Sequence, residues 1–123
     1  MDASVILAVV HRERGFEKMT PELLTQAVVS TVNLAEVQGK LVTKGWSSED
    51  AWEDATGLVD EVATFTADHA QVAGDLIRET RALGLSLADR ACLALALELK
   101  APVYTADRSW KDLKVGVRVH VIR

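Results

Sequence analysis

The sequence has only one cysteine, Cys92, among its 123 residues, so an intrachain disulfide is excluded. Cys92 lies in the apolar run of residues 91–94, and we expect a small buried core residue, since no histidine stands beside it to activate a thiolate. The three histidines, His11, His69 and His120, lack the spacing of zinc ligands. A free cysteine fits a reducing compartment, and we therefore expect a cytoplasmic protein.

Long apolar runs and an excess of basic residues are also missing. No apolar run reaches the roughly 18 to 20 residues that a membrane-spanning helix needs. The stretch at residues 5–10 is short and has no basic leader or cleavage site, so we expect neither a secretory signal nor membrane attachment. The net charge of −4 argues against a protein that coats nucleic acid, but it allows an enzyme that handles nucleic acid locally through metal ions.

The composition is that of an ordinary folded domain. Hydrophobic residues make up 49% of the chain and charged residues 26%, and no polar low-complexity stretch appears. A length of 123 residues is enough for one core. We therefore expect a single domain that spans residues 1–123.

Helical segments alternate with short β-branched segments along the chain. We expect helices at residues 4–14, 21–24, 33–44, 47–60, 68–83 and 87–100, and strands at residues 27–31, 61–66, 103–105 and 117–122, with a short turn or helix at residues 109–113. This alternation predicts a parallel sheet covered by helices on both faces, which is an α/β fold. An open α/β domain normally begins with a strand, and Met1-Asp2 leaves no room for one.

Four carboxylates stand beside the predicted junctions between helices and strands. Asp2 precedes the first helix, Glu36 and Asp89 lie in the first turns of two later helices, and Asp107 follows the strand at residues 103–105. Because ligands of an open parallel sheet bind outside the carboxyl ends of its strands, we expect the four to converge. Carboxylates are the ligands that Mg²⁺ and Mn²⁺ prefer, and such ions support phosphodiester hydrolysis.

Each carboxylate also has a plain structural interpretation. Asp89 has capping-box spacing with Ser86, and a carboxylate at that position favours the helix dipole. Asp107 has the surroundings of an ordinary loop residue, Glu36 those of a solvated helix residue, and Asp2 those of a charged terminus. The four together are more informative than any one of them.

Four segments together resemble the PIN-domain family, and more closely its VapC-type ribonuclease toxins from toxin–antitoxin pairs. These segments are Asp2-Ala3-Ser4, Asn33-Leu34-Ala35-Glu36-Val37, Leu87-Ala88-Asp89-Arg90-Ala91 and Thr105-Ala106-Asp107-Arg108. The resemblance covers nearly the whole chain and implies a three-layer α/β/α sandwich with a central, mainly parallel sheet. It also implies a Mg²⁺- or Mn²⁺-dependent endoribonuclease that acts on structured RNA such as tRNA or ribosomal RNA.

The resemblance also assigns roles to residues and implies partners. The metal-binding and catalytic acids would be Asp2, Glu36, Asp89 and Asp107, with Ser4, Asn33 and Thr105 in support. Candidate phosphate contacts are Arg12, Lys40 and Arg90, although for each residue taken alone solvated surface charge is the more common interpretation. The implied partners are a VapB-like antitoxin, an RNA substrate and a second copy of the chain.

One departure from the family favours a rival interpretation. Family members carry several apolar residues before the first aspartate, which form a central strand, whereas Met1 directly precedes Asp2 here. Either the start of the sequence lies too late or the strand is vestigial, and we expect a truncated first strand. The first alternative function is therefore a catalytically impaired PIN-like binding module.

A second alternative is a phosphoryl-accepting signalling domain. Such a domain also gathers acids at strand ends, with a hydroxyl in the position of Thr105. It would need a lysine after its last strand, where this chain ends Val121-Ile122-Arg123.

Overall fold

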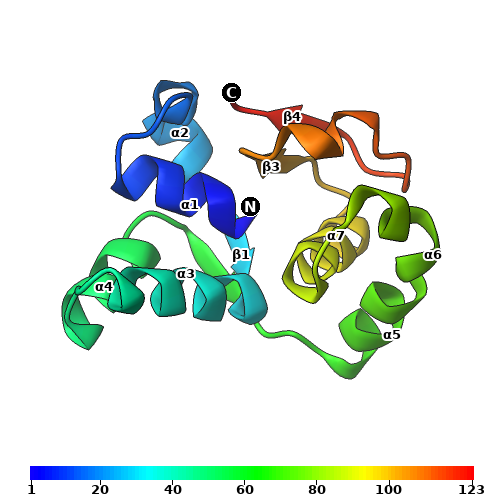
Figure 1. Cartoon of the computed structure of the whole chain (residues 1–123), viewed down its shortest axis with the longest axis horizontal. Helices are drawn as coiled ribbons and strands as arrows, with labels where there is room; N and C mark the ends of the chain where they lie inside the picture. The colour runs from blue at the N-terminus through cyan, green and yellow to red at the C-terminus, as the bar shows by residue number, and fades with distance from the viewer.

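Two separate pairs of parallel strands lie within a set of helices in the computed structural model, which describes all of residues 1–123 (Figure 1). Strand β1 (Val28–Ser30) pairs with β2 (Glu61–Ala63), and β3 (Val103–Thr105) pairs with β4 (Val119–Val121). Val28 lies opposite Glu61 in the first pair, and Val103 lies opposite Val119 in the second. The α/β class with parallel strands is therefore confirmed, although the expected single sheet is replaced by two pairs.

Seven α-helices and three 3₁₀ helices connect these strands. The α-helices are α1 (Ala3–Val10), α2 (Pro21–Leu24), α3 (Thr31–Thr43), α4 (Ser48–Thr56), α5 (Ala67–Asp75), α6 (Ile77–Thr80) and α7 (Leu87–Leu99). The 3₁₀ helices are η1 (Phe16–Lys18), η2 (Arg81–Leu83) and η3 (Arg108–Asp112). Three predicted helices differ in extent. The helix expected at residues 4–14 ends at Val10, the one expected at residues 47–60 ends at Thr56, and the one expected at residues 68–83 is divided into α5, α6 and η2.

Local capping explains why several helices begin where the sequence predicts. The Thr20 hydroxyl accepts from the N–H of Leu23 at the start of α2, and the Ser47 hydroxyl accepts from the N–H of Asp50 at the start of α4. These bonds satisfy N–H groups that a first helical turn leaves without partners. The short range of these interactions makes such boundaries predictable from the sequence.

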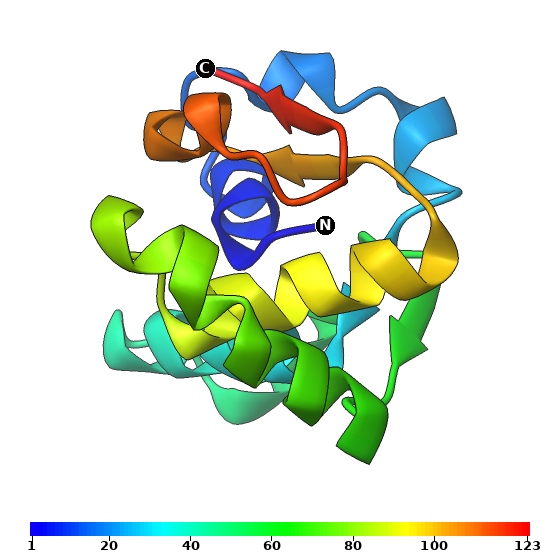
Figure 2. The same ribbon diagram turned by 90° about the vertical axis from the view of Figure 1, so that its right-hand side faces the viewer.

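Helix α7 lies at the centre of the molecule, as its apolar sequence predicts. It contacts α3, α5, β1 and β3, and its residues 91–96 are all buried. Figure 2 shows α7 between the α5 and α6 segment on one side and β3 with β4 above it. Helix α1 contacts α3, α4 and β3. The first turns of α1, α3 and α7 are therefore held in one structural unit.

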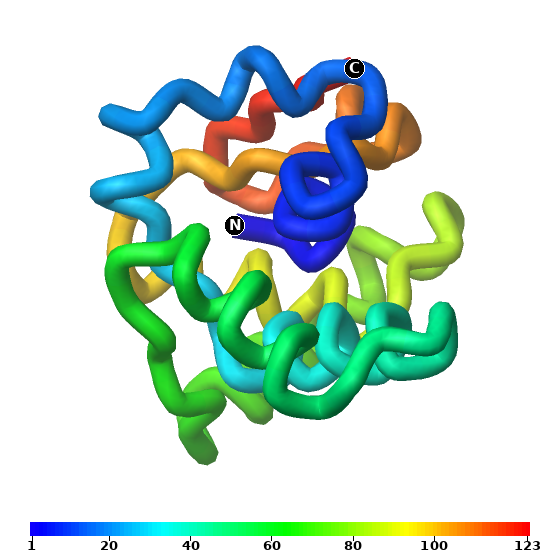
Figure 3. Tube along the Cα trace, turned by 90° about the vertical axis from the view of Figure 1, so that its left-hand side faces the viewer, coloured from blue at the N-terminus to red at the C-terminus, as the bar shows by residue number.

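The start of the chain lies between the two strand pairs. The Met1 ammonium group donates to the Val28 carbonyl over 2.8 Å, and the Asp2 N–H donates to the Tyr104 carbonyl over 3.0 Å. Figure 3 shows the N-terminus between the segments that carry β1 and β3. The end of the chain lies against the turn after α1, since a Cβ at Gly15, whose φ is +94°, would overlap the carbonyl oxygen of Ile122.

None of the helices combines the length and the apolar character that crossing a membrane requires.

Candidate functional site

Asp2 is held by two hydroxyl groups from opposite ends of the sequence. Asp2 is the residue immediately before α1, and it is only 3% exposed. Ser4 Oγ donates to Asp2 Oδ2, and Thr105 Oγ1 donates to the same oxygen over 2.9 Å. Since each hydroxyl has a single hydrogen, both hydrogens are directed at this carboxylate oxygen.

Backbone N–H groups of the segment after β3 fix the two hydroxyls in turn. The N–H of Ala106 donates to Ser4 Oγ over 2.9 Å, and the N–H of Asp107 donates to Thr105 Oγ1 over 3.1 Å. The orientation of Asp2 is therefore set by a network that joins residues 2–4 to residues 105–107. The Ser4 and Thr105 hydroxyls thus contact Asp2, while their role in support of a functional site stays a prediction.

Three of the four predicted acids share one electrostatic environment. Burial raises the pKa of Asp2 above its usual value, bonds from Ser4 and Thr105 oppose this, and the charge of Glu36 raises it further. Burial likewise raises the pKa of Asp89, the Ser86 N–H opposes this, and the charges of Asp2 and Glu36 add to the rise. Asp2, Glu36 and Asp89 therefore lie close enough for their negative charges to repel one another.

Asp89 caps helix α7 and also lies within reach of the charges of Asp2 and Glu36. Its Oδ2 accepts from the Ser86 N–H over 2.8 Å, while its own N–H donates to Ser86 Oγ over 3.1 Å, which is a complete capping box. The capping interpretation therefore holds, yet the same carboxylate faces the field of Asp2 and Glu36. The cap fixes Asp89 at the start of α7 and thereby places it beside the other two acids.

Glu36 has a cation as its partner in this structure. Its Oε1 lies 3.1 Å from Lys40 Nζ, one turn further along α3. Both side chains are partly exposed, so the pair is the kind of surface ion pair that contributes about 0 to 1 kcal/mol. Such a weak contact leaves Glu36 free to exchange Lys40 for another cation.

Asp107 lies at the same edge but directs its carboxylate elsewhere. Its Oδ1 accepts from the Ser109 N–H over 2.8 Å and caps η3, and the residue is exposed. Its link to Asp2 runs through its backbone N–H and the Thr105 hydroxyl. The fold thus brings together three carboxylates and leaves the fourth at the rim.

Asn33 joins α3 to the start of α7 beneath these acids. Its side chain is completely buried, and Nδ2 donates to the Ala88 carbonyl over 2.9 Å. Its Oδ1 is buried without a hydrogen-bond partner. Asn33 therefore fixes the residue before Asp89 and presents an unpaired oxygen acceptor in the same region.

The donor chemistry of these residues suits a hard divalent cation. Three mutually repelling carboxylates provide the charge and oxygen atoms that Mg²⁺ or Mn²⁺ prefers, and the unpaired Oδ1 of Asn33 adds a neutral acceptor. In this side-chain arrangement, however, no three His, Cys, Asp or Glu side chains are grouped closely enough to hold a metal ion. Binding one therefore requires side-chain movement, above all at Glu36.

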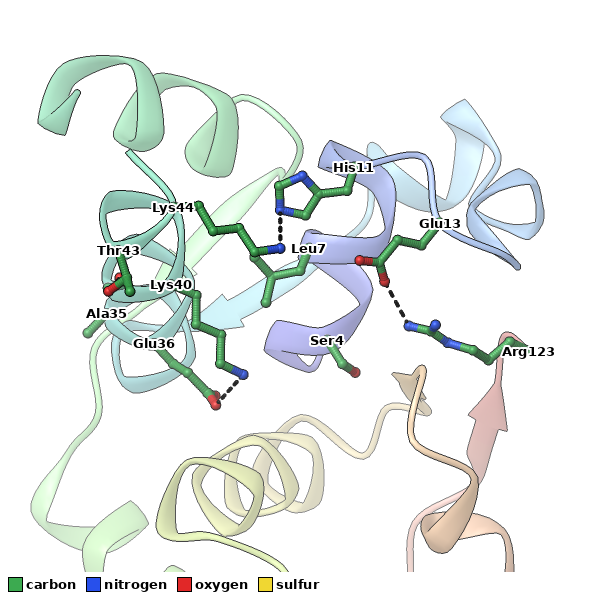
Figure 4. A pocket seen from close by; sticks show the side chains of 11 residues that line it. Ser4, Leu7, His11, Glu13, Ala35, Glu36, Lys40, Thr43, Lys44 and Arg123 are labelled. Carbon is green, nitrogen blue, oxygen red and sulfur yellow. Dashed lines mark hydrogen bonds and ion pairs between the residues drawn. The ribbon is translucent and has the colours of Figure 1, made fainter. Parts of the chain in front are cut away.

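A cavity of about 670 Å³ opens beside Ser4 and Glu36, between α1 and α3 (Figure 4). Its charged lining consists of Glu13, Glu36, Lys40, Lys44 and Arg123, and His11 adds an imidazole. Figure 4 shows the Glu36–Lys40 and Glu13–Arg123 pairs, together with Lys44 Nζ 3.3 Å from His11 Nε2. Lys44 is thus the cation of this cavity that has no carboxylate partner.

The sequence interpretation missed several of these cavity residues. Glu36, Lys40 and Lys44 recur every four residues, so one face of α3 carries all three, and this spacing was a usable signal for Lys44. His11 belongs to a basic cluster after α1, but nothing local indicates that it reaches α3. No signal indicates Arg123, because its place depends on how the chain end packs.

The three candidate phosphate contacts are placed differently. Lys40 lines the cavity, whereas the exposed Arg12 does not. Arg90 Nη1 donates to the Ala73 carbonyl over 2.9 Å, so this side chain holds α7 against α5. Of the three, Lys40 alone lies beside the acids.

Comparisons with known proteins were made on the sequence and on the fold. The family model of the PIN domain matches residues 1–116. A chain of VapBC2 from Rickettsia felis, solved bound to a DNA fragment from their promoter, has 19% identity and a TM-score of 0.71, over 97% of this chain and 94% of that one. A chain of DNA-bound VapBC from Salmonella typhimurium has 16% identity and a TM-score of 0.73, over 99% and 96%. A search of curated proteins found no match.

Proposed function

The chain belongs to the PIN-domain family, and from this premise we propose that it is a divalent-metal-dependent endoribonuclease, the toxin of a toxin–antitoxin pair. The observation that carries the proposal is the buried Asp2, which two hydroxyls orient while Glu36 and Asp89 lie within its electrostatic field. Capping accounts for the position of Asp89, but it does not account for a buried Asp2 and a Glu36 whose negative charges add to the rise of the Asp89 pKa.

Asp2, Glu36 and Asp89 would hold the Mg²⁺ or Mn²⁺ ion, with Asp107 at the rim. When bound, the ion supplies Lewis-acid stabilisation of charge on the scissile phosphate and acidifies a water. Ser4 and Thr105 keep the Asp2 carboxylate in one orientation, so little reorganisation is needed at that residue. The capping box does the same for Asp89.

Lys40 links the acids to the neighbouring cavity. If Glu36 turned to hold a divalent cation, the Lys40 ammonium would lose its partner at 3.1 Å and would be available to a phosphate. Lys44 lies one turn further along the same cavity. We infer that an RNA backbone enters between α1 and α3, along Lys40 and Lys44, and places a phosphate at the acids.

The partner we propose is a VapB-like antitoxin. The similar solved chains come from VapBC assemblies, and the likeness extends over nearly the whole of both chains. An acidic site of this kind suits an arginine from a protein partner, because a guanidinium donates to carboxylates in pairs. A homodimer of this chain is proposed on the family resemblance.

The decisive experiment is cleavage of a total RNA pool in Mg²⁺ or Mn²⁺, with and without EDTA. Asp89→Asn keeps a capping group but removes a charge, and the exposed Asp54→Asn on α4 is the matched control. We expect discrete EDTA-sensitive fragments from the wild type and from Asp54→Asn, and a loss of at least about 100-fold in Asp89→Asn. Equal cleavage by both variants would exclude this acidic site.

A second candidate is an inactive PIN-like binding module. The Glu36–Lys40 ion pair favours it, because a Glu36 side chain that stays bound to Lys40 is not available as a metal ligand. A folded wild type that binds Mn²⁺ by calorimetry, retains RNA and produces no fragments would establish the module in place of the enzyme.

A further inference from the structure

Positive charge is concentrated in residues 108–123, which contain η3, β4 and the loop between them. This segment holds five of the fourteen Lys and Arg side chains of the chain, but only one of its eighteen Asp and Glu side chains, Asp112. The segment therefore has a formal charge of +4, while the rest of the chain has −8. Such a concentration of positive charge within an acidic chain indicates a surface that binds an anionic partner.

A groove between η3 and β4 collects three of these cations. Its cavity measures about 490 Å³, and its charged lining consists of Arg108, Lys111 and Arg123, with no carboxylate. Because side chains three residues apart in a 3₁₀ helix lie above one another, Arg108 and Lys111 share one face of η3. Trp110 between them is fully buried and anchors η3 in the core. The two exposed cations are therefore carried by a helical turn that is fixed to the rest of the fold.

The segment that contains β4 supplies the other wall of the groove. Val119 and Val121 line this wall, and Arg123 follows them at the same spacing of two residues. The Ile122 N–H donates to the Thr105 carbonyl over 2.9 Å, so the pairing with β3 continues past β4 and keeps Arg123 on the side of the two valines. Cations thus line both walls of the groove.

The positive charge of the groove is only partly neutralised within the protein. The three ion pairs of the structure do not include Arg108 or Lys111. Arg123 Nη2 donates to Glu13 Oε2 over 3.1 Å, but the Arg123 Nε is buried without a hydrogen-bond acceptor. Since buried donors are nearly always paired in folded proteins, this N–H group indicates a missing acceptor. Anionic oxygen atoms of a ligand would supply both the charge and the acceptor.

Arg123 also connects the groove to the cavity beside the acids. Its side chain lines both the groove and the larger cavity that Ser4 and Glu36 line, and Ser4 donates to Asp2. Figure 4 shows Arg123 reaching from the end of β4 toward Glu13. The two cavities therefore meet at one side chain, and a polymer of phosphates in the larger cavity has a route into the groove.

We propose that the groove between η3 and β4 binds the phosphate backbone of the RNA, on the far side of Arg123 from the acids. This inference rests on the proposed function, because it extends the path of an RNA that enters along Lys40 and Lys44. Arg108 and Lys111 contact phosphates away from the scissile one, and Arg123 lies between the two parts of the path. Cations spread along a groove suit a polyanion, whose phosphates are spaced along its backbone.

Removal of charge from the groove tests this path. The groove variant combines Arg108→Gln with Lys111→Gln, and the matched control combines Lys100→Gln with Arg118→Gln. Lys100 and Arg118 are exposed cations that line a different groove, of about 380 Å³, at the opposite end of α7 from Asp89. Both changes take the net charge from −4 to −6, so a difference between the two variants reports the position of the charge and not its total.

Affinity for RNA is measured without cleavage by placing each pair of substitutions in the Asp89→Asn chain. Fluorescence anisotropy follows the binding of a labelled single-stranded RNA over a series of salt concentrations. We expect the groove variant to bind at least about 10-fold more weakly than the parent chain at low salt. The slope of log K against log salt should decrease by about 1.4, since each phosphate contact of a single strand contributes about 0.7. The control should retain the slope of the parent chain.

A variant that keeps the charges separates phosphate binding from a structural effect. Arg108→Lys combined with Lys111→Arg exchanges the two side chains but leaves two cations in the groove. This variant should retain the affinity and the salt slope of the parent chain, whereas a role in packing would make it as weak as the groove variant.

The proposal is overturned if the groove variant and the control have equal affinities and equal salt slopes, or if the parent chain does not bind the RNA. It is also overturned if the groove variant loses affinity for an oligoglutamate peptide while keeping its affinity for RNA, because the groove would then take an acidic protein segment. Failure of the proposed function has a different result. Groove-dependent RNA binding by a wild type that does not cleave RNA would support the groove and reject the enzyme.

Discussion

Thr105 tests the idea that a buried hydroxyl network orients Asp2. The side chain is completely buried, donates to Asp2 Oδ2 over 2.9 Å, and accepts from the N–H of Asp107 over 3.1 Å. Thr105→Val preserves the shape of the side chain and removes both bonds. We expect a loss of folding stability, together with weaker cleavage of RNA, because Asp2 loses one of the two groups that orient it.

The magnitude follows from the charge of the acceptor. A hydrogen bond to an ionised group contributes about 1.5 to 3 kcal/mol, and one to a neutral group about 1 kcal/mol. Thr105→Val removes one bond of each kind, about 2.5 to 4 kcal/mol in all. For a chain of 123 residues the unfolding entropy is about 0.26 kcal/mol per kelvin, so the Tm should fall by roughly 10 to 15 °C at pH 8.

The pH dependence has a definite sign. The Thr105 bond lowers the pKa of Asp2, so its removal raises that pKa further. The bond stabilises the ionised form most, and its contribution is therefore largest above the pKa of folded Asp2 and shrinks as the pH falls through it. Thermal unfolding followed by circular dichroism should show a larger loss for Thr105→Val at pH 8 than toward pH 4.

Thr80→Val is the matched control. The Thr80 hydroxyl is also fully buried, but it donates to the backbone carbonyl of Leu76 over 2.8 Å. Its loss should cost about 1 kcal/mol regardless of pH. Thr105→Ser, which retains the hydroxyl, should recover the pH dependence. If Thr105→Val and Thr80→Val lose the same stability at both pH values, the hydroxyl is not a partner of an ionised Asp2.

Three other substitutions test separate parts of the site. Asp2→Asn should raise the Tm by about 4 to 8 °C at pH 7 and abolish stabilisation by Mn²⁺. Because burial raises the pKa of Asp2, the wild type loses stability as the pH rises through that pKa. The gain in Tm from Asp2→Asn should therefore shrink toward pH 4 in calorimetric scans. Arg90→Gln should cost about 1 to 2 kcal/mol in urea unfolding by removing the bond to Ala73, with cleavage per folded molecule unchanged; a selective loss of RNA affinity would contradict this. Lys40→Met should tighten Mn²⁺ binding up to about 5-fold in titration calorimetry, because Glu36 loses a competing cation. The same change should weaken RNA binding. Looser Mn²⁺ binding would refute the idea that Glu36 exchanges Lys40 for a divalent cation.

Local chemistry made much of the fold predictable. Hydroxyl caps such as Ser47 and Ser86 act within one helical turn, and β3 was predicted with its observed bounds. The division of the helix expected at residues 68–83 was not predictable from apolar spacing. In the structure the Thr80 hydroxyl donates to the Leu76 carbonyl near that break, and the Thr80 N–H donates to the same carbonyl over 3.1 Å. Side-chain bonds of this kind often bend helices.

The role of the candidate site stays a prediction, and the structure bears on where its residues lie. The rule that strand ends share one edge placed Asp2, Glu36 and Asp89 together, and their mutual charge effects agree with it. The carboxylate direction of Asp107 was not predictable, because it depends on the cap that this residue provides for η3. The role of Arg90 was equally hidden, since its partner lies on another helix.

The sequence by itself determined the order of the helices and strands and the helix caps, because these depend on residue spacing and short-range hydrogen bonds. Tertiary structure alone decided that Thr105 meets Asp2, that Lys44 and Arg123 share a cavity with Glu36, and that the strands form two pairs around Met1. These features depend on contacts between residues distant in the sequence, which become defined only when the helices and strands pack.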